Sequence, residues 1–404
     1  MPKPAEMRFY SGMNLSRTFL SLVSLAALLF SLATLVESAA AQQKGKYLFY
    51  VGTYTLEGSK SKGIYAYRYD AATQEITPLG LAAETTNPSW VAIHPNGRFL
   101  YAVNEVPNYK GPNSGGVSAF SIDRASGKLT FLNEVASRGA DPCYITVDKT
   151  GKYVLVANYT GGSVAVFPVS EDGKLGEASA FVQHTGHGPN AKRQEAAHAH
   201  SIDMSPDNRF AFVDDLGLDE LLVYKFDASK GTLTPNDPPF AKLPPGAGPR
   251  HFALHPSGKF AYVVAEMHST VTAFSADLKA GTFTPMQNTS ALPADFKGEN
   301  DDAEIEIHPS GKFLYASNRG HDSITLFSVD SAKGTVTPVE YTPTQGKEPR
   351  SFEIDPTGKL IFAQNQHSDT IVLFRIDEKT GKLTPTGKVL EVGQPVCVKF
   401  LAVE

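Results

Sequence analysis

The stretch AHAHSI, at 197–202, carries two histidines with the spacing of a strand pair. Alternate residues of a β-strand project to the same face, so the imidazoles of His198 and His200 are expected to point the same way. A neutral imidazole can take a proton from water near neutral pH. With Glu266 the pair could also begin a metal site, but further ligands are not evident. We therefore expect acid–base chemistry and no metal.

Two arginines lie in short polar motifs that end or begin apolar runs. Arg250 stands in GPRH, at 248–251, and Arg319 stands in SNRG, at 317–320. A guanidinium binds a carboxylate or phosphate through two parallel hydrogen bonds, and it stabilises negative charge that develops during a reaction. The chemistry indicated by these residues is proton transfer beside a developing or bound anion.

Other kinds of catalytic site lack their signatures. No serine stands in G-x-S-x-G, the nucleophile motif of α/β-hydrolases. Cys143 and Cys397 lie far apart and carry no catalytic signature, although Cys143 begins an apolar run. Two cysteines provide no disulfide framework, and we interpret both as small buried side chains.

A repeated pattern must position these residues. It consists of an apolar run, a turn containing Gly, and a second apolar run. Clear copies are PSWVAIHPNGRFLYAVNE (88–105), PRHFALHPSGKFAYVVAE (249–266) and PRSFEIDPTGKLIFAQNQ (349–366). A second hairpin, such as SITLFSVDSAKGTVTPV (323–339), follows each copy. Four short strands in about 50 residues match one blade of a β-propeller.

The two ends of the chain determine the number of blades. Six whole repeats are present, and KYLFYVGTY (46–54) matches the second strand of a seventh. Its third and fourth strands are at 63–80, and its missing first strand is PVCVKF (395–400). We predict an all-β, seven-bladed propeller of four-stranded blades, a single domain over 42–404. Pairing of the N-terminal strands with the C-terminal strand closes the ring.

Propeller topology predicts where the site lies. In each blade the inner strand starts, and the second strand ends, on the same face beside the central channel. Residues at these positions vary between blades and are charged, aromatic or amide, which favours a binding site over a merely water-filled channel. The turns on the opposite face are nearly identical between blades, so their histidines His94, His255 and His308 are predicted to be structural.

Three insertions lengthen connections on the predicted site face. They lie at 107–116, 184–197 and 290–302. Long connections beside a site commonly carry function, so we expect these segments to form walls or lids.

The first 41 residues are typical of an export signal. Three basic residues within the first 17 precede an uncharged apolar run at 19–36, and small residues follow at 38–41. This order matches a signal peptide and its cleavage site. We expect 1–41 to be removed and the protein to be exported, periplasmic or secreted. Retention as a single membrane anchor is the alternative.

Composition excludes several classes of protein. The chain of 404 residues is 41% hydrophobic and 20% charged, with 34 Gly and 27 Pro. A polytopic membrane protein needs several long apolar stretches, and a coiled coil is poor in Gly and Pro. The 24 Phe and 16 Tyr can build a core, which argues against disorder. No basic run provides a footprint for nucleic acid.

The chain resembles the lactonases of the seven-bladed 6-phosphogluconolactonase type, a family related to carboxymuconate-lactonizing cycloisomerases. The motifs that carry the resemblance are AHAHSI (197–202), DLGLDELLVY (215–224), GPRHFALHPSGKFAYVVAE (248–266), DFKGEN (295–300) and SNRGHDSI (317–324). The similarity extends from Lys46 to Phe400. It implies hydrolysis or reversible closure of a sugar-acid or similar lactone without a required metal. It also implies that a His, Glu and Arg centre corresponds to the AHAH histidines, Glu266 and Arg319.

A lactone is a cyclic ester, so its opening needs an activated water, a stabilised oxyanion and a proton for the leaving hydroxyl. The predicted catalytic residues are His198, His200, Glu266 and Arg319. The predicted substrate-binding residues are Arg250, His251, Arg350, Glu304, Asn318, Gln366, Tyr159 and Trp90. We expect a monomer that takes a small anionic or sugar lactone, with no cofactor, nucleic acid or membrane partner. A muconate-type cycloisomerase and a non-catalytic binding propeller are the alternatives.

Overall fold

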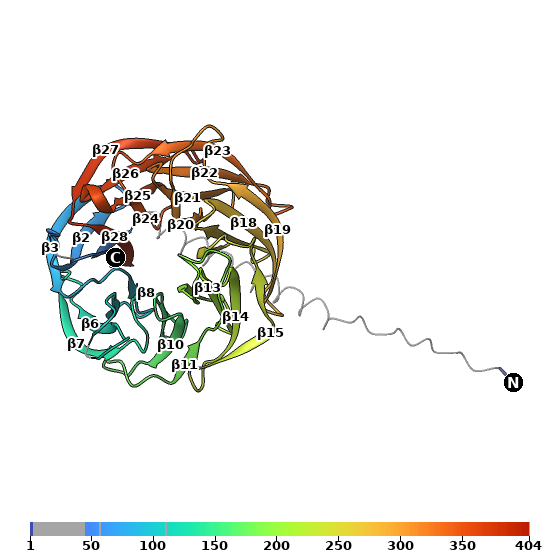
Figure 1. Cartoon of the computed structure of the whole chain (residues 1–404), viewed down its shortest axis with the longest axis horizontal. Coiled ribbons are helices and arrows are strands. Elements are labelled where there is room, and N and C mark those ends of the chain that lie inside the picture. The colour runs from blue at the N-terminus through green and yellow to red at the C-terminus, as the bar shows by residue number, and fades with distance from the viewer. Residues whose placement is uncertain (3–44, 56–57, 110, 404) are drawn as a thin grey trace.

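The strands form seven four-stranded antiparallel sheets arranged around a central axis (Figure 1). The structure is a computed structural model, and it describes residues 1–2, 45–55, 58–109 and 111–403. Within these residues the only helical element is a single 3-10 turn, η1 (Gln366–Ser368). The seven-bladed propeller predicted from the repeats is confirmed.

Each continuous blade runs in chain order from its inner strand to its outer strand. The first three of these blades are β4 (Val91–Ile93), β5 (Phe99–Asn104), β6 (Gly116–Ile122) and β7 (Leu129–Ala136); β8 (Pro142–Val147), β9 (Tyr153–Asn158), β10 (Ser163–Pro168) and β11 (Ala180–Gln183); and β12 (Ala199–Met204), β13 (Phe210–Asp215), β14 (Glu220–Asp227) and β15 (Thr232–Lys242). The next three are β16 (Pro249–Leu254), β17 (Phe260–Ala265), β18 (Thr270–Asp277) and β19 (Thr282–Ser290); β20 (Asp301–Ile307), β21 (Phe313–Arg319), β22 (Ser323–Val329) and β23 (Val336–Pro343); and β24 (Pro349–Ile354), β25 (Leu360–Asn365), β26 (Thr370–Ile376) and β27 (Leu383–Glu391).

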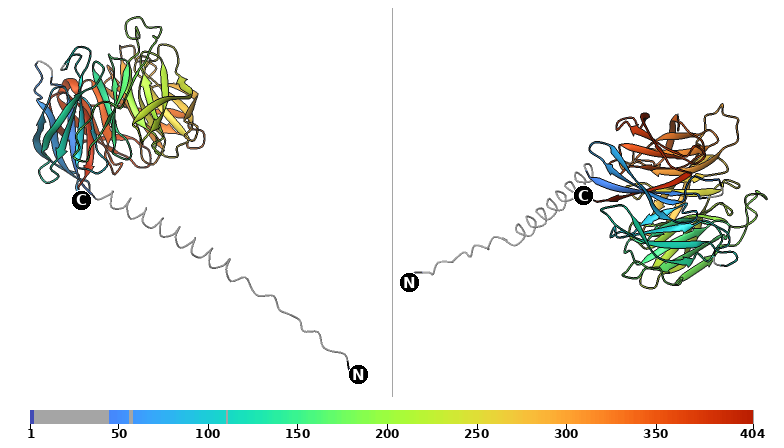
Figure 2. Two further views of the ribbon diagram at one scale, coloured as in Figure 1. Left: turned by 90° about the horizontal axis from the view of Figure 1, so that it is seen from below. Right: turned by 90° about the vertical axis from the view of Figure 1, so that its left-hand side faces the viewer.

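The seventh blade is built from both ends of the chain. It contains β28 (Pro395–Ala402) followed by β1 (Lys46–Thr53), β2 (Gly63–Asp70) and β3 (Glu75–Glu84). β1 and β28 pair antiparallel, from Tyr47 opposite Ala402 to Thr53 opposite Pro395. Figure 2 shows the end of the chain beside the first strands of the ring. The predicted closure is therefore confirmed.

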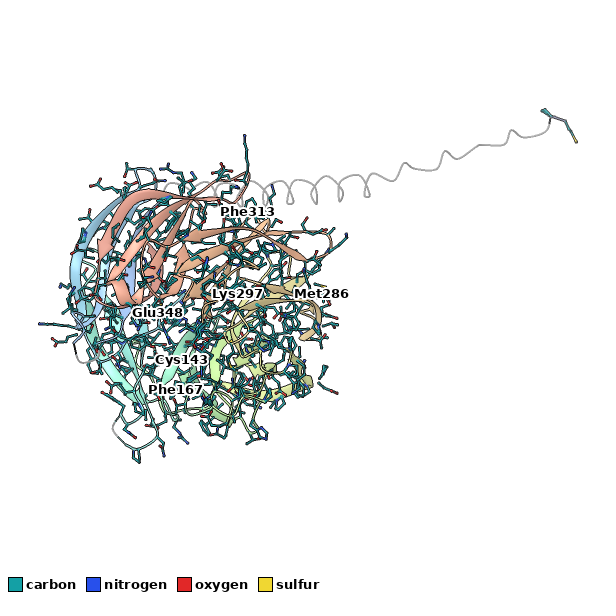
Figure 3. The ribbon with its side chains drawn as sticks, turned by 45° about the horizontal axis from the view of Figure 1, so that its top comes forward. Cys143, Phe167, Met286, Lys297, Phe313 and Glu348 are labelled. Carbon is teal, nitrogen blue, oxygen red and sulfur yellow. The ribbon has the colours of Figure 1, made fainter. Side chains whose placement is uncertain are left out.

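Apolar side chains between neighbouring sheets form the core. At the junction of the last two blades, the ring of Phe49 stacks on Tyr67 at 4.7 Å. It also packs against Phe362 of β25 and Phe400 of β28, both at 5.4 Å between ring centroids. Figure 3 places Met286, on the outermost strand β19, at the rim of the ring and Cys143, on the inner strand β8, near its middle. The apolar contacts between neighbouring blades therefore hold the inner strands in place around the channel.

The three turn histidines join neighbouring blades. In each, the backbone N–H two positions along the turn donates to Nδ1, so Nε2 carries the proton and donates to a carbonyl oxygen in the next blade. These bonds run from His94 to Gly151 at 2.8 Å, from His255 to Gly311 at 3.0 Å and from His308 to Gly358 at 2.8 Å. Their contacts support the structural interpretation of this repeated residue.

All but the first two residues of the expected export signal, 1–41, lie outside the described residues, and its removal stays a prediction. Over the part of the chain that the structure describes, no helix has the length and apolar character needed to cross a membrane. The first strand of the ring, β1, begins at Lys46.

Candidate active site

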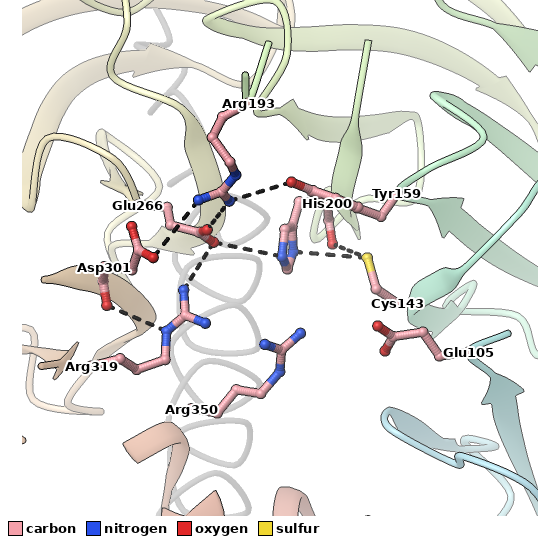
Figure 4. Close-up of a pocket in the computed structure, with 9 residues that line it drawn as sticks. All are labelled: Glu105, Cys143, Tyr159, Arg193, His200, Glu266, Asp301, Arg319 and Arg350. Atoms are coloured by element: carbon pink, nitrogen blue, oxygen red, sulfur yellow. Dashed lines mark hydrogen bonds and ion pairs between the residues drawn. The ribbon is translucent and has the colours of Figure 1, made fainter. Parts of the chain in front are cut away.

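A pocket of about 300 Å³ opens at one end of the central channel. Its walls come from the starts of inner strands, the ends of second strands and two insertions, as the topology predicts. Figure 4 shows the side chains that line it: Glu105, Cys143, Tyr159, Arg193, His200, Glu266, Asp301, Arg319 and Arg350. Five residues predicted for the site are among them: Tyr159, His200, Glu266, Arg319 and Arg350.

A β-bulge that skips one residue near the start of the inner strand recurs in five blades; in the split blade it falls at the apolar Val396, and in the other four it orients a residue that can form polar contacts. At each bulge the pairing with the second strand skips a residue, which re-aims its side chain. In these four blades the skipped residues are Cys143, His200, Arg250 and Arg350. Three of the nine lining residues, Cys143, His200 and Arg350, therefore owe their orientation to the same local distortion in different blades.

Glu266 is the centre of the charge network. Its side chain is 5% exposed, and its Oε2 lies 3.0 Å from Nε of Arg250 and 3.1 Å from Nη2 of Arg319. Its Oε1 accepts a hydrogen bond from Nη2 of Arg193. Burial alone would raise the pKa of Glu266, but the charges of the three arginines outweigh burial and lower it to about 2. Glu266 is therefore ionised near neutral pH.

His200 faces this carboxylate across the pocket. Its Nε2 lies 3.9 Å from Oε2 of Glu266, and its Nδ1 lies 3.9 Å from the sulfur of Cys143. The ring packs edge-on against Tyr159 and His251. Burial, and after it the neighbouring cationic groups, lower the pKa of His200 well below its usual value. The imidazole is consequently neutral near pH 7 and able to accept a proton.

His198 lies behind Tyr159 instead of beside His200. The two rings stack at 4.8 Å, and Nδ1 of His198 lies 3.1 Å from the carbonyl oxygen of Tyr159. The register shift at 199–201 re-aims His200, so the simple alternation expected for the pair does not apply. His200 lines the pocket, and His198 supports the tyrosine that flanks it.

Arg250 lies beneath the pocket lining. It is only 2% exposed, and its Nη1 donates to the carbonyl oxygen of Ala303 and lies 3.2 Å from Nε2 of His251. Burial, followed by the charges of Arg319 and Arg350, lowers its pKa to about 10. Arg250 supports Glu266 from below, which differs from the direct substrate contact expected from the sequence.

A second layer of predicted residues lies under the pocket. Nδ1 of His251 donates to Glu304 at 2.9 Å, while its Nε2 accepts from Arg250. Burial lowers the pKa of His251 to about 4 against the opposing effect of Glu304, so the ring is neutral. Trp90 stacks on Tyr144 at 4.7 Å, and both rings pack edge-on against His251. These side chains fill the channel below the pocket and do not line it.

Asn318 and Gln366 also lie away from the pocket lining. Asn318 is fully buried, and its Nδ2 donates to Ser323 and Thr325 of the neighbouring strand. Gln366 begins η1, where its backbone N–H donates to the carbonyl oxygen of Glu348. Asparagines at the same place in other blades make similar internal bonds: Asn104, Asn158 and Asn365. The amide at the end of the second strand is therefore a repeated structural feature.

Arg193 is a pocket residue that sequence reasoning did not single out. It stands in the insertion at 184–197, which was expected to form a wall. One of its nitrogens lies 3.4 Å from the hydroxyl oxygen of Tyr159, and another lies 3.7 Å from Asp301. Asp301 belongs to the insertion at 290–302. The only available signal was the position of both insertions on the site face.

This wall is fixed at both ends and in its middle. The carboxylate of Asp215 accepts from Nδ1 of His184 at 2.6 Å and from the backbone N–H of His198 at 2.7 Å. Between these ends, the fully buried Gln194 donates to Asp219 at 2.8 Å. The arginine next to Gln194 is therefore held against the pocket by a buried anchor. Of the remaining insertion, at 107–116, no described residue lines the pocket.

Arg350 is the pocket arginine that has no ion pair among the described residues, although, against the effect of burial, the charges of Glu105 and Glu266 raise its pKa. Its guanidinium lies over the ring of Tyr54 at 5.3 Å. Glu105, the carboxylate beside it in Figure 4, accepts from the Tyr54 hydroxyl at 2.8 Å and from the Ser89 hydroxyl. The guanidinium of Arg350 is therefore free to receive an anion.

The two cysteines are free and buried, as interpreted from the sequence. The Cys143 thiol donates to the carbonyl oxygen of His200 at 3.3 Å, and burial raises its pKa, so it carries no thiolate near neutral pH. Among the described residues, His, Cys, Asp and Glu side chains form no group of three or more that could hold a metal ion.

Comparisons with known proteins agree on one family. A family model described as a seven-bladed β-propeller lactonase matches residues 48–400. The chain belongs to this lactonase family. The 6-phosphogluconolactonase of Bacillus subtilis is 41% identical over 356 residues, which are 88% of this chain and 99% of that protein. The 6-phosphogluconolactonase of Formosa agariphila is 36% identical over 307 residues, 75% of this chain and 85% of that one.

A solved structure of a named lactonase is also similar. The periplasmic gluconolactonase of Pseudomonas aeruginosa superposes with a TM-score of 0.81 at 35% sequence identity. The match covers 89% of this chain and 100% of that chain. The family resemblance inferred from the motifs is thereby confirmed.

The charge network of this lactonase predicts that two isosteric substitutions will lower the free energy of unfolding by very different amounts. Glu266→Gln leaves the buried guanidinium of Arg250 without its carboxylate, so we expect a loss of about 3 kcal/mol or more in the free energy of unfolding. Glu105→Gln disturbs only hydrogen bonds from hydroxyl groups, for which we expect about 1 kcal/mol or less. Chemical denaturation of both variants measures the difference. Equal losses would contradict the central place of Glu266 in the network.

Proposed function

We propose that this protein hydrolyses a sugar-acid lactone in the pocket around Glu266. The observation that carries the proposal is that a neutral imidazole, His200, and the guanidinium groups of Arg319 and Arg350 face one cavity. A base and a set of cations are the two requirements of ester hydrolysis. The names of the similar proteins, 6-phosphogluconolactonase and gluconolactonase, support a sugar-acid lactone as the substrate class.

In this proposal His200 activates the attacking water. Its unprotonated nitrogen is available near neutral pH because the pKa of the ring is lowered. The water oxygen forms a bond to the carbonyl carbon of the lactone while its proton passes to Nε2. The result is a tetrahedral intermediate with negative charge on the former carbonyl oxygen and an imidazolium beside it.

Arg319 and Arg350 stabilise the negative charge on that oxygen. Fixed donors directed at developing charge lower the barrier because they need no rearrangement during the reaction. When the intermediate collapses, the bond between the carbon and the ring oxygen breaks. The imidazolium of His200 returns its proton to the leaving oxygen, and the product is an open hydroxy acid. The balance is one water consumed, with no change in oxidation state.

Glu266 orients the arginines in this mechanism. With a pKa of about 2 it holds no proton near neutral pH, so we assign it charge orientation in place of the proton transfer expected from the sequence. His198 contributes by fixing Tyr159 beside His200. Both roles act through neighbouring groups, so these two are positioning residues.

A substrate panel tests the function against its alternatives. Purified protein titrated in a pH-stat should release acid from aldonolactones faster than the spontaneous rate. Turnover of muconate-type diacids alone would indicate the cycloisomerase, and no turnover of either class would indicate a non-catalytic binding propeller.

Variants test the assigned residues in the same assay. His200→Asn and Arg319→Ala should each lower kcat/KM by about 100-fold or more. Arg209→Ala is the matched control, because Arg209 pairs with Asp207 at 2.8 Å in a turn of the opposite face and should change kcat/KM by about twofold at most. Near wild-type hydrolysis in either pocket variant would refute its assignment.

The pH dependence of hydrolysis provides a further prediction. A base acts when it is deprotonated, so activity falls on the acid side only as pH drops through the pKa of the base. Since the pKa of His200 lies well below 6.5, kcat/KM should stay level as the pH is lowered through 6.5. Initial rates corrected for spontaneous hydrolysis measure this profile. An acid limb centred at or above pH 6.5 would contradict it.

We also propose that the enzyme acts outside the cytoplasm. The signal-like sequence of residues 1–41 and the similarity to a periplasmic gluconolactonase support this location. Protein recovered from the periplasm or medium should begin at Gln42 on N-terminal sequencing. An uncleaved chain in the membrane fraction would instead support the anchor.

A further inference from the structure

The charged groups of the pocket lining balance each other. Cys143, Tyr159 and His200 are neutral near pH 7, because burial raises the pKa of the thiol and of the phenol and lowers that of the imidazole. Three positive charges then face three negative charges, so their sum is zero. The charged residues are Arg193, Arg319, Arg350, Glu105, Glu266 and Asp301.

Two of the three pocket arginines are already neutralised by carboxylates. Arg319 lies 3.1 Å from Glu266 and 3.7 Å from Glu348. Arg193 bonds to Glu266 and lies 3.7 Å from Asp301. An anion that approached either guanidinium would also meet these carboxylates, so Arg319 and Arg193 each offer only part of a positive charge, enough for a developing oxyanion but not for a dianion.

Arg350 is the pocket arginine that forms no ion pair among the described residues, although, against the effect of burial, the charges of Glu105 and Glu266 act on it and raise its pKa. Its neighbour Glu105 is held by hydroxyl groups. One free guanidinium matches one negative charge. That is the charge that develops on the carbonyl oxygen of a lactone during hydrolysis, and it is also the charge of the carboxylate product.

Two lysines on the same face of the ring are likewise paired with carboxylates. Lys347 lies 2.8 Å from Asp322, and Lys60 lies 3.1 Å from Asp369. Lys60 lies in the connection between β1 and β2, and Lys347 lies in the connection between β23 and β24. Both connections are on the site face. The two lysines add no unpaired charge that would hold a second anionic group of the substrate.

We propose that the pocket selects unphosphorylated aldonolactones over phosphorylated ones. The inference rests on the proposed lactone hydrolysis and adds the charge state of the substrate. An uncharged lactone enters a neutral pocket without electrostatic cost, and only its transition state becomes negative, opposite Arg319 and Arg350. A phosphate monoester brings nearly two negative charges near neutral pH. The lining carboxylates Glu105, Glu266 and Asp301 would repel it in a partly desolvated cavity, where such repulsion is strong.

A pair of substrates that differ only in the phosphate tests the selectivity. Initial rates are measured on the purified protein with glucono-1,5-lactone and with its 6-phosphate, each corrected for spontaneous hydrolysis. We expect kcat/KM to favour the unphosphorylated lactone by roughly tenfold or more. Equal values, or a preference for the phosphate, would overturn the inference while leaving the proposed function intact. Hydrolysis of neither lactone would refute the proposed function and the inference with it.

An isosteric charge change tests the electrostatic cause. Asp301→Asn removes one negative charge from the lining and leaves Arg193 with Glu266 as its one carboxylate partner among the described residues, while the backbone carbonyl of residue 301 still accepts from Arg319. The preference should shift severalfold toward the phosphorylated lactone, through a lower KM for that substrate. Asp295→Asn, in the same insertion but exposed and outside the lining, is the matched control and should leave the ratio unchanged. An unchanged ratio in Asp301→Asn, or an equal shift in both variants, would overturn the electrostatic explanation.

Discussion

One buried carboxylate holds together three guanidinium groups that would otherwise repel each other. Arg193, Arg250 and Arg319 come from an insertion and from two different blades, and Glu266 contacts all three. A buried charge is tolerated only when it is paired and hydrogen-bonded, so the position of each arginine depends on this carboxylate. The ion pairs of Glu266 therefore both link the neighbouring blades and set the charge distribution in the pocket.

The propeller supports this network by repeating a framework and varying one residue. Every blade supplies an inner strand that begins at the channel. In four blades a bulge in this strand orients a residue in or beneath the pocket: Cys143, His200, Arg250 and Arg350. Nothing in the backbone pattern distinguishes a bulge that presents Cys143 from one that presents His200. The chemistry of the site therefore depends on side-chain identity at equivalent positions, while the opposite face repeats turns that join the blades.

The fold could be read from the sequence because its signal is repeated seven times, and the same reasoning located the site face. It identified His200, Glu266, Arg319, Arg350 and Tyr159 as pocket residues. It could not place His198, because a shift of one residue in pairing leaves no trace in a pattern of apolar alternation. Arg193 was missed because the reach of a side chain from an insertion depends on tertiary anchors. Asn318 was misplaced although an asparagine at the same point in other blades, as at Asn104, already indicated a structural role.

The split blade has a consequence for biosynthesis. β1 is made first among the described strands and β28 last, yet the two are neighbours in one sheet. While the chain emerges from the ribosome, β1 has no inner partner, and six complete blades cannot form a closed ring. Closure therefore requires residues 395–402, which are synthesised after every residue of the pocket. Until then the partly folded chain has an open sheet edge at each end, and such edges are prone to pairing with other chains.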